Sequence, residues 1–486
     1  MAGAEIFIVY TGGTIGMGHK DPMVPGSPLA PQPFEDMLGY AHGLEELLEA
    51  KQITYNYFSF DPPLDSSSIT PGHWKQIANK IEEVYEAYDG FVILHGTDTL
   101  AYTASGLSFM FKNLAKPVVL TGSQLPISEA RTDGIANLTN AIYLAAYRAT
   151  KLPCIPEVVV LFGDKILRGC RTSKVSTTSW TAFDSPNFPA LGTVGELIRI
   201  NEPLLRPAPK DSAFHIQTSL VTDVMDISLF PGLSPVNLSA VMKLEGVKAV
   251  LLRTFGAGNG PETENFLDVI EEVIQEEHKI VVNISQCQQG MVQMGQYDSS
   301  SGLLERGVIS GTDMTPEAAL TKLFCVLGAN QGGDIGKEMQ VSQRGEQSEN
   351  LFDIRFGAIG EKRGPVQTFT HYQTPDRRLV VEDISRAVIR LKKVAFPKKD
   401  QKTEHIELKV FMNLPSAKAD TPADHPRCIA SFQIDRPKKD EQMIVQVNDQ
   451  QFRSLAGDGD ITLTVVASNG NKFYCEGLFL AVFAKA

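Results

Sequence analysis

The stretch EIFIVYTGGTIGMG, residues 5–18, joins a short apolar run to a glycine-rich turn that holds a threonine. The run EIFIVY has the β-branched and aromatic composition of a buried strand, and Thr14 follows it. The glycines are not spaced as GxGxxG, so the turn does not predict a nicotinamide cofactor. Ligands of parallel sheets bind beyond the carboxyl ends of the strands, where Thr14 lies. Thr14 is therefore a candidate site residue, although threonine is also common in turns that have no function.

Similar apolar runs alternate with helix-like segments along most of the chain. GFVILHG, KPVVLTGS and PEVVVLFG read as strands, and the segments between them have helical periodicity. Buried strands separated by helices predict an α/β fold with a parallel sheet covered on both faces. The composition predicts a large parallel-sheet domain over residues 1–200, a proline-rich linker over 201–212 and a smaller α/β domain over 213–350.

The pattern changes beyond residue 350. HIELKVFMNL and ITLTVVAS are short strands with alternating or continuous apolar residues, and helical periodicity is scarce. We expect residues 351–486 to form an additional all-β, sandwich-like domain, to which the sequence assigns no role. Its basic stretch RLKKVAFPKKDQK could bind an anion, but such charge runs more often form a solvated edge.

Composition excludes several classes of function. A formal net charge of −12 disfavours nucleic acid and anionic membranes as partners. The first residues do not resemble a signal peptide, and no apolar stretch approaches the ~18 residues of a membrane helix. The six cysteines form no CxxC pair, which argues against a zinc site or a disulfide framework. We expect a protein of a reducing, cytoplasmic setting.

Three further segments carry polar residues that can take part in catalysis or binding. HGTDTL places Thr97 and Asp98 after a second strand, so that two strand ends would present threonines to one crevice. RGCRTSK adds Lys174, and burial would favour the neutral amine that can act as a base toward a hydroxyl. DSSSITP adds Asp65, Ser66 and Ser67.

Together the motifs resemble one family. YTGGTIG, DSSSITP, HGTDTLAYTAS, TGSQLPISEARTDG, RGCRTSK, RTFGAGN and MTPEAALTKL are similar to those of the bacterial type I (cytoplasmic) L-asparaginases, in the asparaginase/glutaminase amidohydrolase family. The resemblance covers residues 5–345. It implies hydrolysis of L-asparagine to L-aspartate and ammonia, without metal or cofactor, by a homo-oligomer that is a dimer or a dimer of dimers.

The resemblance also implies residue roles. Thr14 corresponds to the nucleophile that forms an acyl-enzyme, while Thr97, Asp98 and Lys174 correspond to a second catalytic triad. Residues implied in substrate binding are Asp65, Ser66, Ser67, Thr97, Asp98 and, from a neighbouring subunit, Asn259.

The resemblance bears on two further roles. The loop GHKDPMVPGSP lacks the tyrosine that many relatives carry near the nucleophile, so Tyr297 is a candidate for the first-step base, with an exposed loop tyrosine as the alternative. Some relatives have a second, regulatory asparagine site, which corresponds here to Ser173, Arg253, Ser285 and Cys287. An alternative function is a mixed glutaminase-asparaginase, and another is a non-catalytic scaffold for the C-terminal domain.

Overall fold

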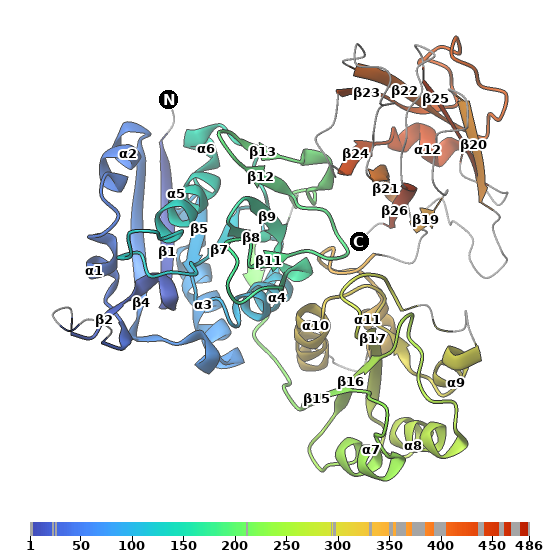
Figure 1. Cartoon of the computed structure of the whole chain (residues 1–486), viewed down its shortest axis with the longest axis horizontal. Helices are drawn as coiled ribbons and strands as arrows, with labels where there is room; N and C mark the ends of the chain where they lie inside the picture. The colour runs from blue at the N-terminus through green and yellow to red at the C-terminus, as the bar shows by residue number, and fades with distance from the viewer. Residues whose placement is uncertain are drawn as a thin grey trace. The chain divides into compact units, whose positions relative to one another are not determined.

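A computed structural model describes residues 3–21, 24, 27–209, 212–292, 294, 298–329, 333–348, 353–355, 366–371, 384–392, 405–435, 442–455, 461–467 and 477–484 (Figure 1). The chain divides into two compact units, Met1–Gln347 and Ser348–Ala486. Every sequence-predicted site residue belongs to the first unit.

An eight-stranded sheet organises the N-terminal half of the first unit. Its strand order is β13-β12-β9-β8-β7-β5-β1-β4. The strands are β1 (Ala4–Gly12), β4 (Ile53–Leu64), β5 (Gly90–Leu94), β7 (Val118–Thr121), β8 (Val158–Phe162), β9 (Lys165–Arg168), β12 (Gly192–Val194) and β13 (Ile198–Ile200). The quoted stretch at residues 5–18 supplies β1, which pairs in parallel with both β4 and β5.

The sheet is mixed rather than parallel, which corrects the expectation from the sequence. Strands β4, β1, β5, β7 and β8 run parallel, whereas β9, β12 and β13 pair antiparallel. The reason lies between β8 and β9, which are separated only by Gly163 and Asp164. A parallel neighbour needs a crossover of a dozen or more residues, so this two-residue connection forces a hairpin. Gly163 takes the positive φ of 60° that such a turn requires.

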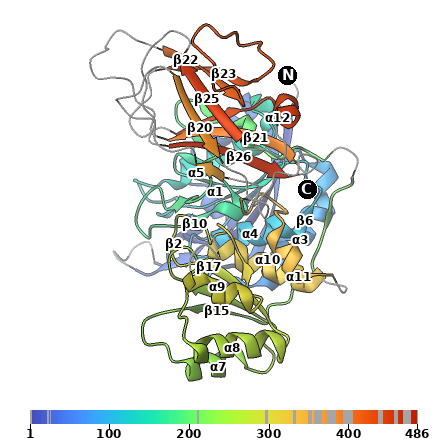
Figure 2. The same cartoon turned by 90° about the vertical axis from the view of Figure 1, so that its right-hand side faces the viewer.

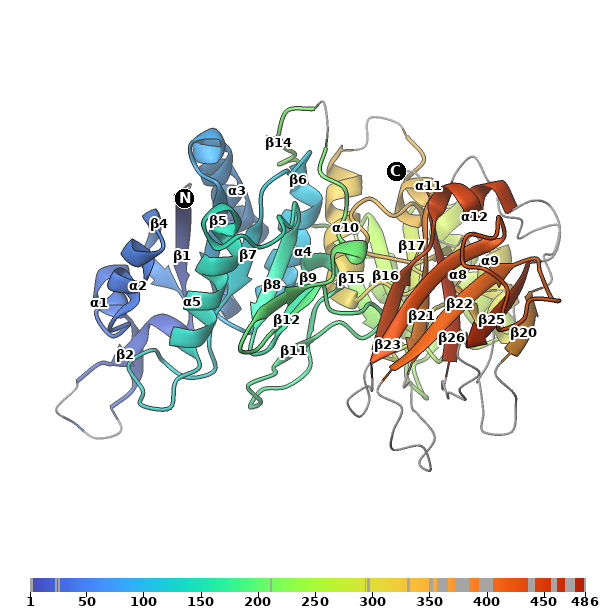
Figure 3. The same ribbon diagram turned by 90° about the horizontal axis from the view of Figure 1, so that it is seen from above.

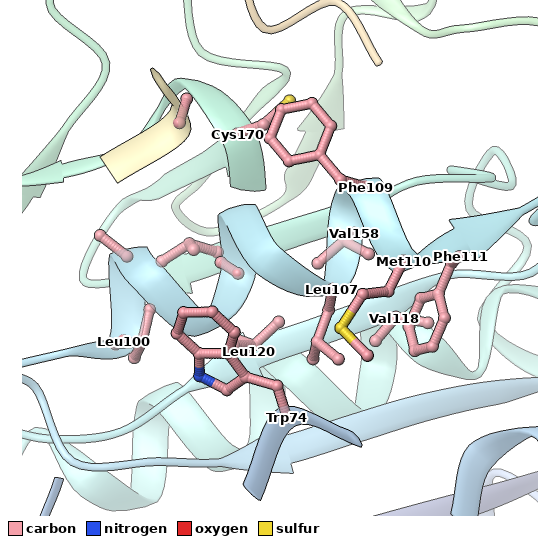
Figure 4. Close-up of a cluster of buried hydrophobic side chains, with 14 of the residues drawn as sticks. Trp74, Leu100, Leu107, Phe109, Met110, Phe111, Val118, Leu120, Val158 and Cys170 are labelled. Carbon is pink, nitrogen blue, oxygen red and sulfur yellow. The ribbon is translucent and has the colours of Figure 1, made fainter. Parts of the chain in front are cut away.

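Helices cover both faces of this sheet, as Figure 3 shows. Helices α3 (Pro71–Val84) and α4 (Leu100–Met110) pack on one face, and α5 (Gly134–Ala145) contacts β5, β7 and β8. The core between α3, α4 and the sheet includes Trp74, Leu107 and Leu120 (Figure 4). Nearly every residue of α4 is buried, so this apolar helix runs through the middle of the unit.

A smaller α/β lobe completes the first unit. Its parallel sheet has the order β15-β16-β17-β18, formed by β15 (Val224–Ser228), β16 (Ala249–Thr254), β17 (Ile280–Ser285) and β18 (Ile309–Ser310). Helices α7 (Pro235–Met242) and α8 (Glu264–Gln275) lie side by side in Figures 1 and 2. Helix α10 (Pro316–Ala329) packs on α4 and so joins the lobe to the large sheet.

Short elements complete the first unit. They are η1 (Thr14–Gly16), β2 (Met17–His19), β3 (Leu29–Pro31), α1 (Phe34–Leu38), α2 (Leu44–Ala50), η2 (Ser66–Ser68), η3 (Tyr85–Ala87), β6 (Phe111–Lys112), α6 (Tyr147–Thr150), η4 (Gly169–Arg171), β10 (Ser173–Lys174), β11 (Phe183–Asp184), η5 (Glu202–Leu204), β14 (His215–Ile216), α9 (Asp298–Glu305) and α11 (Ile335–Gln340). Within the proline-rich stretch 201–212, Leu204 is buried and the Arg206 amide bonds the Glu157 carboxylate at 2.7 Å. This part of the stretch is therefore packed against the first domain.

The second unit contains two four-stranded antiparallel sheets, of order β19-β26-β21-β24 and β20-β25-β22-β23. The strands are β19 (Asp353–Arg355), β20 (Val366–His371), β21 (Ile384–Lys392), β22 (His405–Met412), β23 (Cys428–Asp435), β24 (Gln442–Gln446), β25 (Ile461–Ala467) and β26 (Gly477–Ala484). Helix α12 (Asp449–Leu455) contacts β21 and β23, so the unit is not built of strands alone. The sandwich-like arrangement stays a prediction.

Candidate active site

Three turns meet through glycines at the carboxyl ends of β1, β4 and β5. Gly13 has a φ of 87°, and a Cβ atom there would lie 2.3 Å from the Gly96 Cα. A Cβ atom on Gly96 would lie 2.5 Å from the Ser66 Oγ. No side chain fits at either position, since real Cβ contacts are never so short. The glycines of the quoted stretch therefore allow the turn that carries Thr14 to pack against the turn that carries Thr97.

Lys174 joins the second turn through two hydrogen bonds. Its Nζ donates to the Thr97 Oγ1 at 2.9 Å and to the Asp98 Oδ1 at 2.7 Å. The side chain of Lys174 is 18% exposed and that of Asp98 63% exposed, so the carboxylate faces solvent beside an enclosed ammonium. Thr97 is buried. The sequence placed Lys174 in a different segment from Thr97 and Asp98, and the structure brings all three into one hydrogen-bonded cluster.

The DSSS segment forms the rim next to this cluster. The Ser66 Oγ accepts a hydrogen bond from the Asp98 amide at 3.3 Å, and the Thr99 hydroxyl donates to the Ser66 carbonyl at 2.6 Å. Asp65 caps η2 by accepting from the Ser67 amide at 2.8 Å and from its hydroxyl at 2.9 Å. The segment is thereby held rigidly against the Asp98 turn.

Thr14 opens η1 and is half-buried. Within the part of the chain that the structure describes, no group hydrogen-bonds its hydroxyl. The alternative that Thr14 only stabilises its own turn would require such a bond. A side-chain hydroxyl without a partner at a strand end is available to a ligand.

His95 supports the same turn from the interior. Trp74 Nε1 donates to the Thr103 Oγ1 at 2.9 Å, and the Thr103 Oγ1 lies 2.8 Å from the His95 Nε2. The His95 Nδ1 lies 2.7 Å from the Gly96 carbonyl oxygen, which can only accept, so Nδ1 carries the proton and Nε2 accepts from Thr103. The fully buried ring is neutral, because burial lowers the pKa of His95 to about 4.

This histidine predicts a pH dependence of stability. The unfolded chain takes up a proton at His95 near pH 6.5, and the folded chain only near pH 4. Between these values the unfolded state binds more protons, so the free energy of unfolding falls as the pH falls, by about 3 kcal/mol in total. Urea unfolding followed by tryptophan fluorescence measures it, because both tryptophans, Trp74 and Trp180, lie in the first unit.

Two variants separate this contribution from that of other groups. The His95→Asn variant should have a lower free energy of unfolding at pH 7. Its free energy of unfolding should also depend much less on pH between 6.5 and 4. The His19→Gln variant changes an exposed histidine, and its free energy of unfolding should depend on pH as that of the wild type does. A His95→Asn variant with an unchanged slope would show that His95 does not titrate as inferred.

Glu317 is a residue of this region that the sequence reasoning missed. Its Oε2 accepts a hydrogen bond of 2.8 Å from the Ser173 hydroxyl, directly before Lys174. Burial raises the pKa of Glu317, although hydrogen bonds to its carboxylate, including that from Ser173, oppose the shift. The motif MTPEAALTKL contained this glutamate, but nothing in the local pattern distinguishes it from a helix N-terminal residue.

The remaining predicted residues lie in the smaller lobe. Arg253 donates its Nε to the Asp226 Oδ1 at 2.8 Å and also bonds the Oδ2 atom. The Ser285 hydroxyl donates to the Gly256 carbonyl at 2.6 Å and accepts from the Cys287 amide at 3.0 Å.

Among the described residues, Asn259, like Arg253 and Ser285, makes no hydrogen bond to the Lys174 cluster. Asn259 closes a tight turn by bonding Phe255, and its side-chain oxygen is buried without a partner among the described residues. Tyr297 lies outside the described residues. Among the described residues there is no cluster of histidine, cysteine and acidic side chains able to hold a metal ion, and none of their helices is long and apolar enough to cross a membrane.

The arrangement suits acyl transfer. It offers a free hydroxyl on one turn, a lysine that holds a second hydroxyl on the adjacent turn, and an exposed carboxylate beside them. Hydrolysis of an acyl group through hydroxyl groups requires such features.

Comparison with known proteins gives the family. The family model for "Asparaginase, N-terminal" matches residues 5–206, and that for "Glutaminase/Asparaginase C-terminal domain" matches residues 223–339. L-asparaginase 1 of Escherichia coli is 39% identical over 349 residues, which cover 70% of this chain and 97% of that protein. The 60 kDa lysophospholipase of Mus musculus is 41% identical over 338 residues, which cover 67% of this chain and 58% of that protein.

A comparison with solved structures points to the same family. The crystal structure of L-asparaginase I from Vibrio cholerae has a TM-score of 0.63 and 39% identity, and the match covers 71% of this chain and 99% of that one. The chain therefore belongs to the asparaginase/glutaminase family, which confirms the resemblance found in the motifs.

Proposed function

We propose that this protein hydrolyses L-asparagine to L-aspartate and ammonia. The Thr14 hydroxyl attacks the side-chain amide carbon, the C–N bond breaks, and ammonia leaves with the proton that Thr14 gave up. Water then attacks the acyl-threonine ester, which releases aspartate and restores the hydroxyl. Backbone N–H groups of the Thr97 turn would stabilise the tetrahedral oxyanion, each contributing ~3 kcal/mol.

The observation that carries this proposal is the packing of the two threonine turns. The Gly13–Gly96 contact packs the turn that carries Thr14 against the turn where Lys174 holds Thr97. In this arrangement Lys174 and Asp98 orient the Thr97 hydroxyl, through which a proton can pass to the leaving nitrogen or from the water.

The residues at the rim of the site would recognise the charged groups of the amino-acid substrate. The exposed Asp98 carboxylate would pair with the α-ammonium group, while Ser66 and the backbone around Asp65 and Ser67 would hold the α-carboxylate. Asn259 would come from a neighbouring subunit of a homodimer or homotetramer. Tyr297 would act as the base of the first step. These residues belong to the α/β domains at 1–200 and 213–350, and none to residues 351–486; we place the enzyme in the cytoplasm.

A coupled ammonia-release assay on the purified full chain tests the function. L-asparagine should be turned over with a higher kcat/KM than L-glutamine, because the extra methylene displaces the amide from the two threonine turns. Equal turnover of both substrates would identify a mixed glutaminase-asparaginase. Absence of ammonia release from either one would contradict the proposed function and favour the scaffold alternative.

We also propose that Ser173, Arg253, Ser285 and Cys287 form a regulatory asparagine site. An arginine and hydroxyl groups can bind an amino-acid carboxylate and amide. The Arg253 guanidinium already forms an ion pair with Asp226. The carboxylate of an effector must displace Asp226 from Arg253, and this cost lowers the affinity for the effector. Ser173 precedes Lys174 and bonds Glu317, so an effector there can shift the triad lysine.

The regulatory site predicts a sigmoidal dependence of rate on asparagine concentration. Ser173→Ala should make the curve hyperbolic while leaving the rate at saturating asparagine within about twofold, because the hydroxyl contacts Glu317 and not the triad. Ser173→Thr keeps the hydroxyl and should stay sigmoidal. Steady-state kinetics over a wide range of asparagine concentrations measure both, and a hyperbolic wild-type curve would contradict the regulatory role.

A further inference from the structure

A cavity of about 130 Å³ lies in the first unit beside the C-terminal end of α4. Its lining includes Ser108, Glu157, Arg168, Arg206 and Arg344. A water molecule needs only ~15 Å³ of such space, so the cavity has room for a small ligand. Three arginines and a single carboxylate give the lining an excess of positive charge.

The one carboxylate neutralises only one of the arginines. Glu157 accepts from the Arg168 Nε at 2.6 Å and from its Nη2 at 3.1 Å, and also accepts the Arg206 backbone amide at 2.7 Å. Both side chains of the pair are nearly fully buried. Both oxygens of Glu157 accept hydrogen bonds from the Arg168 guanidinium, and one of them also accepts the Arg206 backbone amide. Neither oxygen bonds the side chain of Arg206 or Arg344.

Neither of those two guanidinium groups forms an ion pair with a carboxylate of the described residues, since none lies within 4.0 Å. The charges of Glu346 and Glu157 act on Arg344 and Arg206 only from a greater distance. Arg344 donates instead to two carbonyls, that of Ser108 at 2.9 Å and that of Gln343 at 2.7 Å. Burial and the neighbouring Arg206 charge lower the pKa of Arg344. Both side chains are half-buried, so an anion bound beside them would gain from charge pairing that bulk water screens less than at an open surface.

We propose that this cavity binds a small anion, through a carboxylate or phosphate group held between the guanidinium groups of Arg206 and Arg344. Guanidinium groups bind both kinds of anion through paired, charge-assisted hydrogen bonds. Two arginines that line one cavity match a dianion better than a monoanion, because each positive charge then has its own counter-charge.

The cavity is separate from the active site. Thr97 and Asp98 lie just before the first residue of α4, whereas Ser108 and Phe111 line the cavity at its other end. The helix has 11 residues, which span roughly 16 Å. Figure 4 shows Leu100 and Phe111 at opposite ends of this helix. An anion in the cavity therefore leaves the amino-acid site free.

Calorimetric titration of the full chain with inorganic phosphate and, separately, with succinate tests the proposal. The buffer contains chloride at matched ionic strength. At least one of the two anions should bind, and the comparison shows whether phosphate or carboxylate is preferred. Arg206→Gln should weaken this binding by roughly tenfold or more, because it removes one charge-assisted contact.

The controls are matched in charge. Arg199→Gln removes an exposed arginine of β13 and should keep wild-type affinity. Arg206→Lys keeps the charge without the planar fork and should bind with intermediate affinity. Arg206 suits the test because its structural bond to Glu157 comes from the backbone, which every variant retains. Absence of binding by both anions, or unchanged affinity in Arg206→Gln, would each overturn the proposal.

Discussion

Thr14→Ala should lower kcat for asparagine by roughly 10⁴-fold or more, while the fold remains intact. The hydroxyl is the only group of Thr14 that can form the acyl bond, and no described residue depends on it for a hydrogen bond. The substitution therefore removes the proposed nucleophile and leaves no buried hydrogen-bond partner unsatisfied. Ammonia release under saturating asparagine, together with the tryptophan fluorescence of the folded chain, measures both parts of the expectation.

A threonine three residues earlier provides the matched control. Thr11 is buried in β1 and donates to the Leu94 carbonyl at 3.0 Å, so its role is structural. Thr11→Val should lower the free energy of unfolding by about 1–2 kcal/mol and leave kcat within about twofold. Near-normal turnover by Thr14→Ala would refute the nucleophile assignment, and equal loss in both variants would mean that the effect is one of folding.

Glu346→Leu should destabilise the first unit by about 3–5 kcal/mol. Glu346 and Lys322 are fully buried, and their charged groups lie 2.6 Å apart. Burial disfavours a charged carboxylate, yet the Lys322 ammonium lowers the pKa of Glu346 to about 2. Removing the carboxylate leaves a buried ammonium whose remaining contacts are the carbonyls of Met339 and Val341. Urea unfolding followed by tryptophan fluorescence at pH 7 measures the loss.

A double variant distinguishes an unpaired charge from lost packing. Lys322→Met/Glu346→Leu removes both charges and should recover part of the stability. Recovery stays incomplete because Glu346 also accepts the amides of Gln343 and Arg344. Glu83→Gln, in an exposed pair with Lys80, should cost less than about 1 kcal/mol. If the double variant is no more stable than Glu346→Leu, the loss does not come from the unpaired lysine.

The buried pair also holds the end of the first unit in place. Besides the Lys322–Glu346 contact, Arg171 donates to the Gly345 carbonyl at 2.7 Å and pairs with Asp313 at 2.8 Å. These contacts join the last residues of the unit to the large domain and to the smaller lobe. The sequence suggested a boundary near residue 350, but it gave no indication that residues 343–347 carry buried charges.

Local pattern predicted much of the first unit. Continuous apolar runs identified β1, β5, β7 and β8, because buried strands need apolar residues on both faces. The antiparallel edge was missed, since β9 and β12 are short and their direction depends on a two-residue connection. Strand β4 was also missed, because its polar residues and prolines hide the apolar pattern.

The sequence by itself determined the family and supplied the candidate site residues, because glycine-rich turns after strands are local features whose residue types can be recognised directly. Only the tertiary structure decided which of them meet: Lys174 bonds Thr97 across 77 positions, and Ser173 bonds Glu317 across 144. The arginine cavity, too, combines η4, the segment at 206–209 and Arg344. The physical reason is that such contacts depend on strand order and on the packing of α4 and α10 between the lobes, and a charged residue carries no local signal of the partner that neutralises it.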